Sequence, residues 1–498
     1  MEKEEEVLGL KTKEDYIERL KKMKRNVYIG GEKVGHVDER LLPGINVVSV
    51  TFDMAHDPEF EDLCTAKSHI TGEKINRFCH IHQSREDLLK KQEMTRLICQ
   101  RTGGCIQRCM GIDAMNALSV VTKLIDMQYD TNYCERFLNY LKYFQKNDIV
   151  ANCAQTDVKG DRIRRPHEQE DPDLYLRVVE KRDDGIIVRG AKAHNTIAPY
   201  ADEIIAIPTR TLTKEEGDWA VAFAIPADTN GVKLVVRPAY LRKRIKLHAP
   251  IAKFGDAESL TIFDNVFVPW ERVFMCGEWE HGRALALLFA LYHRHSYTGC
   301  KPAVSDVLGG AAALIAECNN IERATHVRDK LSHFIGLSEL VYAAGIASAH
   351  YARESPSGTY IPDPVYTNAG RRLAGENIYH EYELLADLAG GLACTLPFEA
   401  DFYNEETGDL LNKYIMRNPK LSSEYVHRAF RLVENILASD LTGVLQVAGV
   451  HGGGSPVMET IMMVGTYNVE KIKDIARYLA GIKKELPRIR REDLVRFL

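Results

Sequence analysis

The chain reads His293-Arg-His-Ser-Tyr297-Thr-Gly-Cys300-Lys301-Pro302 directly after an apolar run, 284–292, that predicts a buried helix. On a helix, residues seven apart return to nearly the same face, about 10 Å further along the axis. His293 and Cys300 would therefore face the same way, with Tyr297 between them and Lys301 beside them. Two metal-ligand types, a phenol and an ammonium make a poor hydrophobic face. The stripe therefore indicates a site.

The same stretch carries two residues that disfavour a regular helix. Pro302 cannot donate a backbone hydrogen bond to the carbonyl of Thr298, and Gly299 loosens the same turn. A kink or break is expected there. The stretch predicts a broken helix that carries ligands.

Bulk properties exclude several classes of protein. The 498 residues suggest about three domains, and 45% hydrophobic with 27% charged residues is ordinary for a globular protein. A net charge of −5, without a basic patch interleaved with aromatics, argues against nucleic acid as a partner. The acidic start is unlike a secretory signal, and no apolar run approaches the roughly 20 residues of a membrane span. We expect no membrane partner and a cytoplasmic protein.

The chain divides into three parts by pattern. Residues 1–148 have helical periodicity and capping signals, residues 149–276 contain short β-branched runs, and residues 277–498 return to helical spacing. The expected strands begin at Leu174, Gly185, Glu203, Trp219, Val232 and Leu260. The middle part should form an antiparallel sheet. Helices, a β-domain and a helical bundle in this order predict an α+β fold like that of acyl-CoA dehydrogenases.

Eleven cysteines, odd in number and irregularly spread, favour reduced thiols or metal ligands over disulfides. A helix opening at Ser84 should run toward Cys99, and Gly103 and Gly104 should then interrupt the helical pattern. Cys105 and Cys109 should then lie one turn apart on the next helix and could share a metal centre. The alternative is that both are small residues packed against a neighbouring helix.

Together, Cys105, Cys109, Cys300 and His293 form a set of three thiols and one imidazole. Such a set can hold structural zinc or an iron–sulfur cluster, and spacing does not choose between them. Either centre would fasten the first helical part to the last. Cys99 and His295 are the rivals for the cysteine pair and for His293.

Five segments carry a resemblance to a known family. They are Thr102-Gly-Gly-Cys105-Ile-Gln-Arg-Cys109, Ala154-Gln-Thr-Asp-Val-Lys-Gly-Asp-Arg162, Val188-Arg-Gly-Ala-Lys-Ala-His194-Asn-Thr196, His293 through Lys301, and His451-Gly-Gly-Gly. With these, nearly the whole chain resembles the 4-hydroxybutyryl-CoA dehydratase family of flavin and [4Fe–4S] enzymes. The fold relatives of that family include flavin-dependent 4-hydroxyphenylacetate 3-monooxygenases.

The resemblance implies residue roles. Cys105, Cys109, His293 and Cys300 would ligate the cluster, and the catalytic groups would be His293, Tyr297, Lys301, Glu459, Glu258 and Thr196. FAD would contact Gln155, Thr156, Asp157, Lys159, Arg162, His194, Asn195, Thr196, Gly453 and Gly454. Taken without the resemblance, Glu258 and Glu459 are better explained as surface carboxylates or helix caps, Lys301 could be solvated, and Tyr297 could be packing. His194 and Thr196 could simply satisfy strand-end hydrogen bonds.

The activity that the resemblance implies is dehydration of 4-hydroxybutyryl-CoA to crotonyl-CoA, with vinylacetyl-CoA Δ-isomerisation as a companion activity. The hydrogen lost from C3 is not acidified by an adjacent carbonyl, whereas the C2 proton is. In the family mechanism, radical chemistry overcomes the low acidity of the C3 hydrogen, and FAD takes and returns one electron. His293 would serve as a base, Tyr297 would protonate the departing hydroxide, and Glu459 would carry a proton on the flavin side. Relatives also imply a homotetramer.

Two other functions are compatible with the sequence. One is a flavin-dependent aromatic hydroxylase of the same fold, although such an enzyme has no use for the four ligands. The other is a non-catalytic helical scaffold stapled by zinc. The sequence has no clean basic motif for the CoA phosphates.

Overall fold

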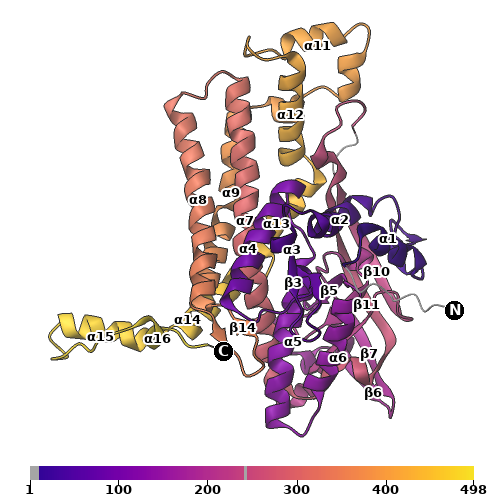
Figure 1. Cartoon of the computed structure of the whole chain (residues 1–498), viewed down its shortest axis with the longest axis vertical. Coiled ribbons are helices and arrows are strands. Elements are labelled where there is room, and N and C mark those ends of the chain that lie inside the picture. Colours follow the sequence, from indigo (N-terminus) through magenta and orange to yellow (C-terminus); the bar gives the residue numbers. More distant parts are fainter. Residues whose placement is uncertain (1–9, 241–243, 498) are drawn as a thin grey trace.

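The computed structural model describes residues 10–240 and 244–497. Its first part is mostly helical (Figure 1). Helix α1 opens with a capping box, since the Thr12 hydroxyl accepts from the Asp15 N–H and the Asp15 carboxylate accepts from the Thr12 N–H. The helices are α1 (Lys13–Lys22), α2 (Leu42–His56), α3 (Glu61–Cys64), α4 (Arg85–Thr102), α5 (Cys109–Gln128) and α6 (Tyr133–Lys146).

The middle of the chain forms two sheets. The larger has the order β2-β1-β10-β11-β7-β6 and the smaller β12-β9-β8-β5. The strands are β1 (Val27–Ile29), β2 (Glu32–Val34), β5 (Ala151–Ala154), β6 (Arg177–Lys181), β7 (Gly185–Lys192), β8 (Glu203–Ala206), β9 (Val221–Pro226), β10 (Val232–Tyr240), β11 (Gly255–Pro269) and β12 (Val273–Cys276). Two small hairpins, β3 (Thr65–Lys67) with β4 (Lys74–Asn76) and β13 (Arg353–Glu354) with β14 (Tyr360–Ile361), lie outside these sheets.

The six strands expected from the sequence are all present, and β7 has the expected bounds. The sequence missed β5 and β12, and it missed β1 and β2 within the part expected to be helical. The sheets are also not purely antiparallel, because β1 pairs with β10 and β5 pairs with β8 in parallel. The division into three domains stays a prediction, because β1 and β2 join the sheet of the middle part.

The last part is a helical bundle around α7 (Gly282–Cys318). Helices α4 and α5 of the first part contact α7, as do α8 (Thr325–His350) and α9 (Pro364–Ala389). The remaining helices are α10 (Leu392–Thr395), α11 (Gly408–Tyr414), α12 (Ser423–Leu437), α13 (Asp440–His451), α14 (Pro456–Thr466), α15 (Val469–Leu479) and α16 (Arg491–Leu494). In Figure 1, α15 and α16 form an arm that projects from the body.

The break expected at Pro302 is wrong, since α7 continues through the proline for 37 residues. The Thr298 carbonyl, which Pro302 leaves without its helical donor, accepts instead from Gln92 Nε2 at 3.1 Å. Gly299 does not loosen the turn. A Cβ at this position would clash with the backbone of Gln92, so the glycine allows α4 to approach α7 closely. A side chain of the neighbouring helix α4 therefore donates the hydrogen bond that Pro302 cannot donate.

One helix of the described residues, α8, has the length and composition that could span a bilayer. A third of its most apolar window is buried. Because α8 packs against α7 and α9, its apolar character is also that of a helix in a bundle. This feature is weak evidence of a membrane partner.

Candidate active site

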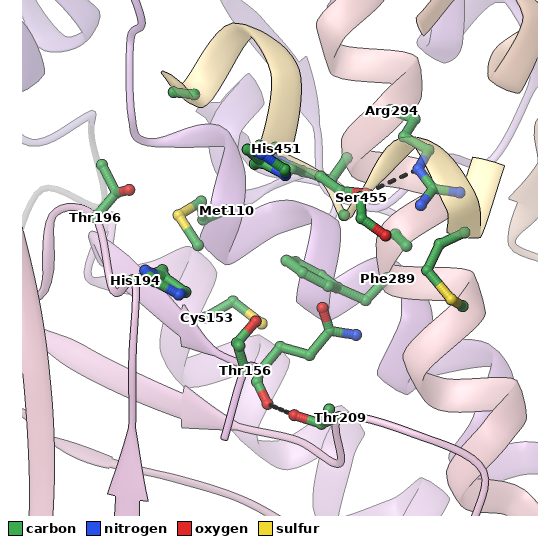
Figure 2. Close-up of a pocket in the computed structure, with 18 of the residues that line it drawn as sticks. Met110, Cys153, Thr156, His194, Thr196, Thr209, Phe289, Arg294, His451 and Ser455 are labelled. Atoms are coloured by element: carbon green, nitrogen blue, oxygen red, sulfur yellow. Dashed lines mark hydrogen bonds between the residues drawn. The ribbon is translucent and has the colours of Figure 1, made fainter. Parts of the chain in front are cut away.

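A cavity of about 1430 Å³ lies between the sheets, α7 and the loop that joins α13 to α14. Its wall takes residues from all three parts of the chain. In Figure 2, Thr156 and His194 face His451 and Ser455 across the open space. Cys105, His293, Tyr297, Cys300 and Lys301 belong to the same wall. The stripe identified on α7 therefore faces a cavity.

Cys105 reaches the cavity from a loop and not from a helix. Helix α4 ends at Thr102, Gly103 has the left-handed φ of +73° that caps it, and α5 begins only at Cys109. The expected one-turn spacing of Cys105 and Cys109 on a helix is therefore wrong. Gln107 fixes the loop, because its Nε2 donates to the Gly255 carbonyl at 2.9 Å and its Oε1 accepts from the Tyr200 hydroxyl at 2.5 Å.

Three of the four expected metal ligands, Cys105, His293 and Cys300, line the cavity, and Cys109 does not. Cys109 Sγ lies 3.8 Å from His293 Nδ1, while Cys105 and Cys300 line the cavity. Burial raises the pKa of the Cys105 and Cys109 thiols, and the neighbouring thiols and carboxyl groups raise it further. Thiols with such pKa values bind a metal only when the metal displaces the proton.

The two rivals lie behind this set. Cys99 is fully buried on α4 and does not line the cavity, and burial raises the pKa of its thiol. It hydrogen-bonds Cys300, which is the main reason that the pKa of the Cys300 thiol is lowered. His295 is also fully buried and does not line the cavity. Of the two histidines, His293 is the one on the cavity wall.

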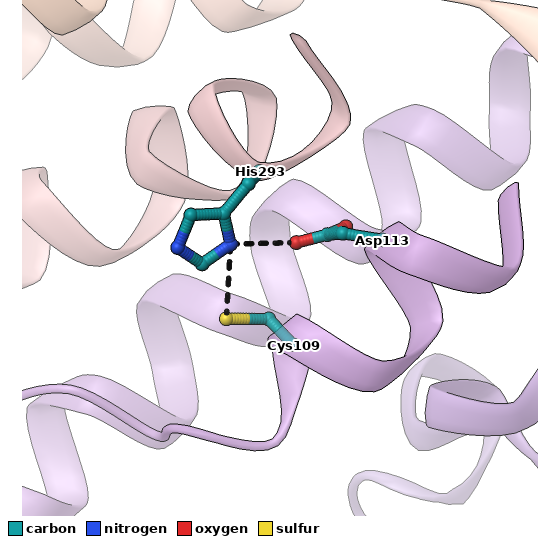
Figure 3. Close-up of side chains that lie close together, drawn as sticks. All are labelled: Cys109, Asp113 and His293. Carbon is teal, nitrogen blue, oxygen red and sulfur yellow. Dashed lines mark hydrogen bonds and ion pairs between the residues drawn. The ribbon is translucent and has the colours of Figure 1, made fainter. Parts of the chain in front are cut away.

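Asp113 is a neighbour of these ligands that the sequence analysis missed. Its Oδ2 lies 2.9 Å from His293 Nδ1, and Cys109, Asp113 and His293 place their donor atoms within 4.8 Å of one another (Figure 3). The available signal was a charged residue one turn after Cys109, inside the apolar run of α5.

Tyr297 and Lys301 lie beside each other under a buried guanidinium. The Lys301 ammonium lies 5.3 Å and the Arg371 guanidinium 4.7 Å from the centre of the Tyr297 ring. Burial raises the pKa of Tyr297 well above its ordinary value, although Arg371 opposes the shift. Burial likewise lowers the pKa of Lys301. Tyr297 is held as a protonated phenol with cations close to its ring.

Thr196 and Glu258 form a second polar pair on the wall. The Thr196 hydroxyl donates to Glu258 Oε1 at 2.6 Å, and Glu258 Oε2 is buried without a partner among the described residues. Burial raises the pKa of Glu258, and the Thr196 hydrogen bond opposes this shift. This carboxyl group is suited to holding a proton.

Glu459 is not on the cavity wall. It is 1% exposed on α14, behind the loop Gly452–Ser455, and its carboxylate lies 3.7 Å from Arg371 Nε. Burial raises the pKa of Glu459, while Arg371 and Arg294 lower it. Both arginines also hold the loop, since Arg371 donates to the Gly452 carbonyl and Arg294 to the Gly453 carbonyl at 2.8 Å each.

Nearly all the residues expected to contact flavin line the cavity. They are Gln155, Thr156, Lys159, Arg162, His194, Asn195, Thr196, Gly453 and Gly454. Asp157 does not. It is buried beneath the wall, 2.8 Å from Lys192 Nζ, and it accepts from the Leu176 N–H at 2.9 Å. Asp157 has a structural role at this position, because it neutralises Lys192, which is only 2% exposed.

Comparison with known proteins gives consistent matches over the whole length. The model "4-hydroxyphenylacetate 3-hydroxylase N terminal" matches residues 12–275, and the corresponding C-terminal model matches residues 283–481. The chain is 42% identical over 489 residues to "4-hydroxybutyryl-CoA dehydratase/vinylacetyl-CoA-Delta-isomerase" of Clostridium aminobutyricum, covering 95% of this chain and 100% of the relative. It is 29% identical to the 4-hydroxyphenylacetate 3-monooxygenase oxygenase component of Thermus thermophilus, covering 96% and 98%.

Two solved structures share the fold. An oxygen-tolerant archaeal 4-hydroxybutyryl-CoA dehydratase from N. maritimus matches with a TM-score of 0.91 and 40% identity over 97% of both chains. The oxygenase component of 4-hydroxyphenylacetate 3-monooxygenase, complexed with FAD, matches with a TM-score of 0.85 and 26% identity, covering 95% of this chain and 98% of the other.

Proposed function

The chain belongs to the 4-hydroxyphenylacetate 3-hydroxylase family, and we propose that within this family it is a 4-hydroxybutyryl-CoA dehydratase. It would convert 4-hydroxybutyryl-CoA to crotonyl-CoA and act as a vinylacetyl-CoA Δ-isomerase. The observation that carries the proposal is that Cys105, Cys300, His293 and Tyr297 meet on one cavity wall. The 42% identity to a dehydratase over nearly the whole chain supports it.

FAD fits the cavity by its chemistry. The wall offers the cations Lys159, Arg162 and Arg210 for phosphates. Gly453 and Gly454 have φ of +75° and +107°, and a loop without side chains lets a ring system approach its backbone. A family structure complexed with FAD supports the same cofactor. When bound, FAD would supply an acceptor that takes one electron from the substrate and returns it.

A [4Fe–4S] cluster fits the donor set of three thiols and one imidazole, and we propose Cys105, Cys109, Cys300 and His293 as its ligands. Among the described residues, Cys109, Asp113 and His293 form the only group of three or more His, Cys, Asp or Glu residues whose donor atoms all lie within 4.8 Å of one another. A single zinc ion draws all four ligands to about 2.0–2.3 Å, so the wider placement of Cys105 and Cys300 favours a larger centre over a zinc staple. When bound, the cluster would supply a Lewis-acidic iron for the 4-hydroxyl group.

We assign each proton transfer to a side chain by the position of that side chain on the cavity wall. His293 would take a proton from the substrate at Nε2 once that nitrogen is released from the cluster, since its Nδ1 contacts Asp113 at 2.9 Å. Tyr297 would donate its phenolic proton to the departing hydroxide, because its high pKa keeps it protonated until then. Lys301 and Arg371 would stabilise the phenolate left behind.

The remaining groups would act on the flavin side. Glu258 would hold a proton at Oε2, while Thr196 fixes the other carboxylate oxygen. Glu459 could carry a proton only through the loop in front of it, since the cavity does not reach it. The cavity wall would exclude water from the acyl chain by its apolar residues Phe289, Leu445 and Met462.

Analysis of anaerobically purified protein tests the proposal. We expect a brown protein that contains iron, acid-labile sulfide and flavin and that forms crotonyl-CoA from 4-hydroxybutyryl-CoA. A colourless protein containing only zinc would contradict it, and so would a flavoprotein without iron that does not dehydrate the substrate.

An aromatic hydroxylase is the second candidate, because relatives at 29% identity are monooxygenase components. The test is hydroxylation of 4-hydroxyphenylacetate with reduced FAD and oxygen. Turnover in this assay, together with an absence of iron in the purified protein, would favour the hydroxylase.

A further inference from the structure

A buried ion pair lies directly behind the cavity wall. Lys91 of α4 and Asp113 of α5 are 2% and 0% exposed, and the Lys91 ammonium contacts Asp113 Oδ1. Removing two charges from water is costly unless each is well paired. Neither residue lines the cavity, so the proposed chemistry does not by itself explain why this pair is here.

The same carboxylate is the meeting point of three helices. Asp113 accepts from His293 Nδ1 at 2.9 Å, and the Ser296 hydroxyl of α7 lies 3.0 Å from Oδ2 and 3.2 Å from Oδ1. With the Lys91 contact, both carboxylate oxygens are satisfied. Lys91 and Ser296 therefore hold the Asp113 carboxylate in place independently of its contact with His293.

This contact decides which nitrogen of His293 is available. A ring nitrogen that donates to a carboxylate carries the proton, so the other nitrogen keeps its lone pair. Figure 3 shows Nδ1 directed at Asp113 and Nε2 pointing away from both Asp113 and Cys109. The Phe289 ring stacks on the His293 imidazole with 5.6 Å between the ring centres, and the Tyr297 ring meets the imidazole edge-on with 5.2 Å between the ring centres. These two contacts limit rotation of the imidazole.

Asp113 could instead be a metal ligand, since its donor atom lies within 4.8 Å of those of Cys109 and His293. Two observations oppose this reading. The Lys91 ammonium already neutralises the carboxylate, and an ion at this place would leave Cys105 and Cys300 on the cavity wall unused. The contact of Asp113 with His293 is better explained as a hydrogen bond that orients the ring.

We propose that Asp113 is a positioning residue that fixes His293 as its Nδ1–H tautomer and aims Nε2 at the reaction centre, with Lys91 and Ser296 holding the Asp113 carboxylate in place. This rests on the proposed function, in which His293 serves as ligand and base. Partners of this kind, one shell behind a ligating histidine, commonly change metal affinity or activity by about 10–100-fold.

The test compares Asp113→Asn with Asp113→Glu in anaerobic holoenzyme, with His293→Ala as the reference for complete loss of the imidazole. In Asp113→Asn we expect kcat for 4-hydroxybutyryl-CoA to fall about 10–100-fold with little change in KM, and iron to be lost faster to a chelator. Pulsed EPR of the reduced cluster should show altered ¹⁴N couplings of the coordinated imidazole. Asp113→Glu restores a carboxylate, so it should recover part of both kcat and the wild-type couplings.

Asp148→Asn is the matched control, because Asp148 and Arg108 form another buried ion pair, 4% and 1% exposed, that does not touch His293. It should lower thermal stability and leave the ¹⁴N couplings and kcat unchanged. Wild-type couplings and kcat in Asp113→Asn would overturn the inference, as would equal changes in Asp148→Asn. A wild-type protein without cluster and dehydratase activity would instead refute the proposed function.

Discussion

Glu258 is a carboxyl group on the cavity wall with one oxygen that has no partner among the described residues. Thr196 occupies Oε1, Oε2 has no partner among the described residues, and burial raises the pKa of this group. In Glu258→Gln the side chain keeps its size and can still accept from Thr196, but it can no longer release a proton. We expect kcat for 4-hydroxybutyryl-CoA to fall about 100-fold or more, measured as crotonyl-CoA formation by enzyme with full flavin and iron content.

Thr196→Val distinguishes the contributions of the two oxygens of the Glu258 carboxyl group. It removes the donor to Oε1 and leaves Oε2 unchanged, so it should reduce kcat less than Glu258→Gln does. A Glu258→Gln enzyme that keeps wild-type kcat would show that Glu258 transfers no proton.

At the residue scale, the sequence identified groups whose chemistry is visible in their type and spacing. Cys105, Cys300, His293, Tyr297 and Lys301 all line one cavity, and their roles as ligands and catalytic groups stay predictions. The sequence did not identify Asp113 and Arg371. Each is a buried charged residue whose role depends on its interaction partner, and that partner is distant in the chain. Lys91 precedes Asp113 by 22 residues, and Arg371 binds a carbonyl 81 residues later. Only tertiary packing selects such pairs.

At the scale of elements, Gln92 joins three helices. Its Nε2 donates to the Thr298 carbonyl of α7 at 3.1 Å and to the Tyr342 carbonyl of α8 at 2.8 Å, and the residue is fully buried on α4. Gln92→Leu would leave both carbonyls without this donor. Since an unsatisfied buried polar group costs about 1–3 kcal/mol, we expect the midpoint of urea unfolding to fall, followed by circular dichroism.

Gln100 provides the control on the same helix. It is exposed, and its side chain donates to Asp306 at 2.7 Å. Gln100→Leu should change the unfolding midpoint much less than Gln92→Leu. Equal effects would mean that the carbonyls of α7 and α8 do not depend on Gln92.

Two expectations about elements were wrong for the same physical reason. The sequence placed a break at Pro302 and placed Cys105 on a helix, and both inferences used local propensity alone. In the structure, Gln92 supplies the hydrogen bond that Pro302 cannot, and Gln107 fixes the non-helical loop through Gly255 and Tyr200. Donors from distant elements override local preference at both places.

At the scale of the whole molecule, acid stability should depend in part on His427. Its ring stacks on Phe402 at 3.6 Å and accepts from Arg431 Nε at 3.0 Å. Burial, with Arg431 beside it, lowers the pKa of His427 from 6.5 to about 4. Between these values the unfolded chain binds more protons than the folded chain, so the free energy of unfolding falls as pH falls from about 6.5 to about 4.

His427→Gln keeps an acceptor for Arg431 and removes the titration. The variant should therefore lose less Tm than the wild type when the pH is lowered from about 7 to about 5. Calorimetry at several pH values measures the difference. Parallel Tm curves for the two proteins would show that His427 does not contribute to acid sensitivity.

The pattern of helices and strands was sufficient to predict a mixed α and β fold. It could not predict that residues 27–34 join the large sheet, because β1 pairs with β10 about 200 residues later in the chain. Strands of three residues are too short to show alternation of apolar and polar side chains. The acyl-CoA dehydrogenase-like order of domains and a cytoplasmic location stay predictions.

The arm formed by α15 and α16 gives a prediction about assembly. None of the residues of α15 is buried, although Ile472, Ile475 and Leu479 repeat at helical spacing, with Leu479 77% exposed. An amphipathic helix with an uncovered apolar face is more stable when another surface covers it, and α8 also exposes apolar side chains, including Ile335. We therefore expect these faces to be buried between subunits of the homotetramer that the family resemblance implies, whose mass would be about four times 56.3 kDa.

Ile475→Asp places a charge on that face and should shift the mass measured by light scattering toward smaller assemblies. Met127→Asp, at an exposed apolar residue of α5 far along the chain from the arm, is the control and should leave the mass unchanged. Because α15 projects from the body of the subunit (Figure 1), the charge should disturb assembly without unfolding the subunit, which circular dichroism would verify. A wild-type protein that runs as a monomer at all concentrations would contradict the expectation.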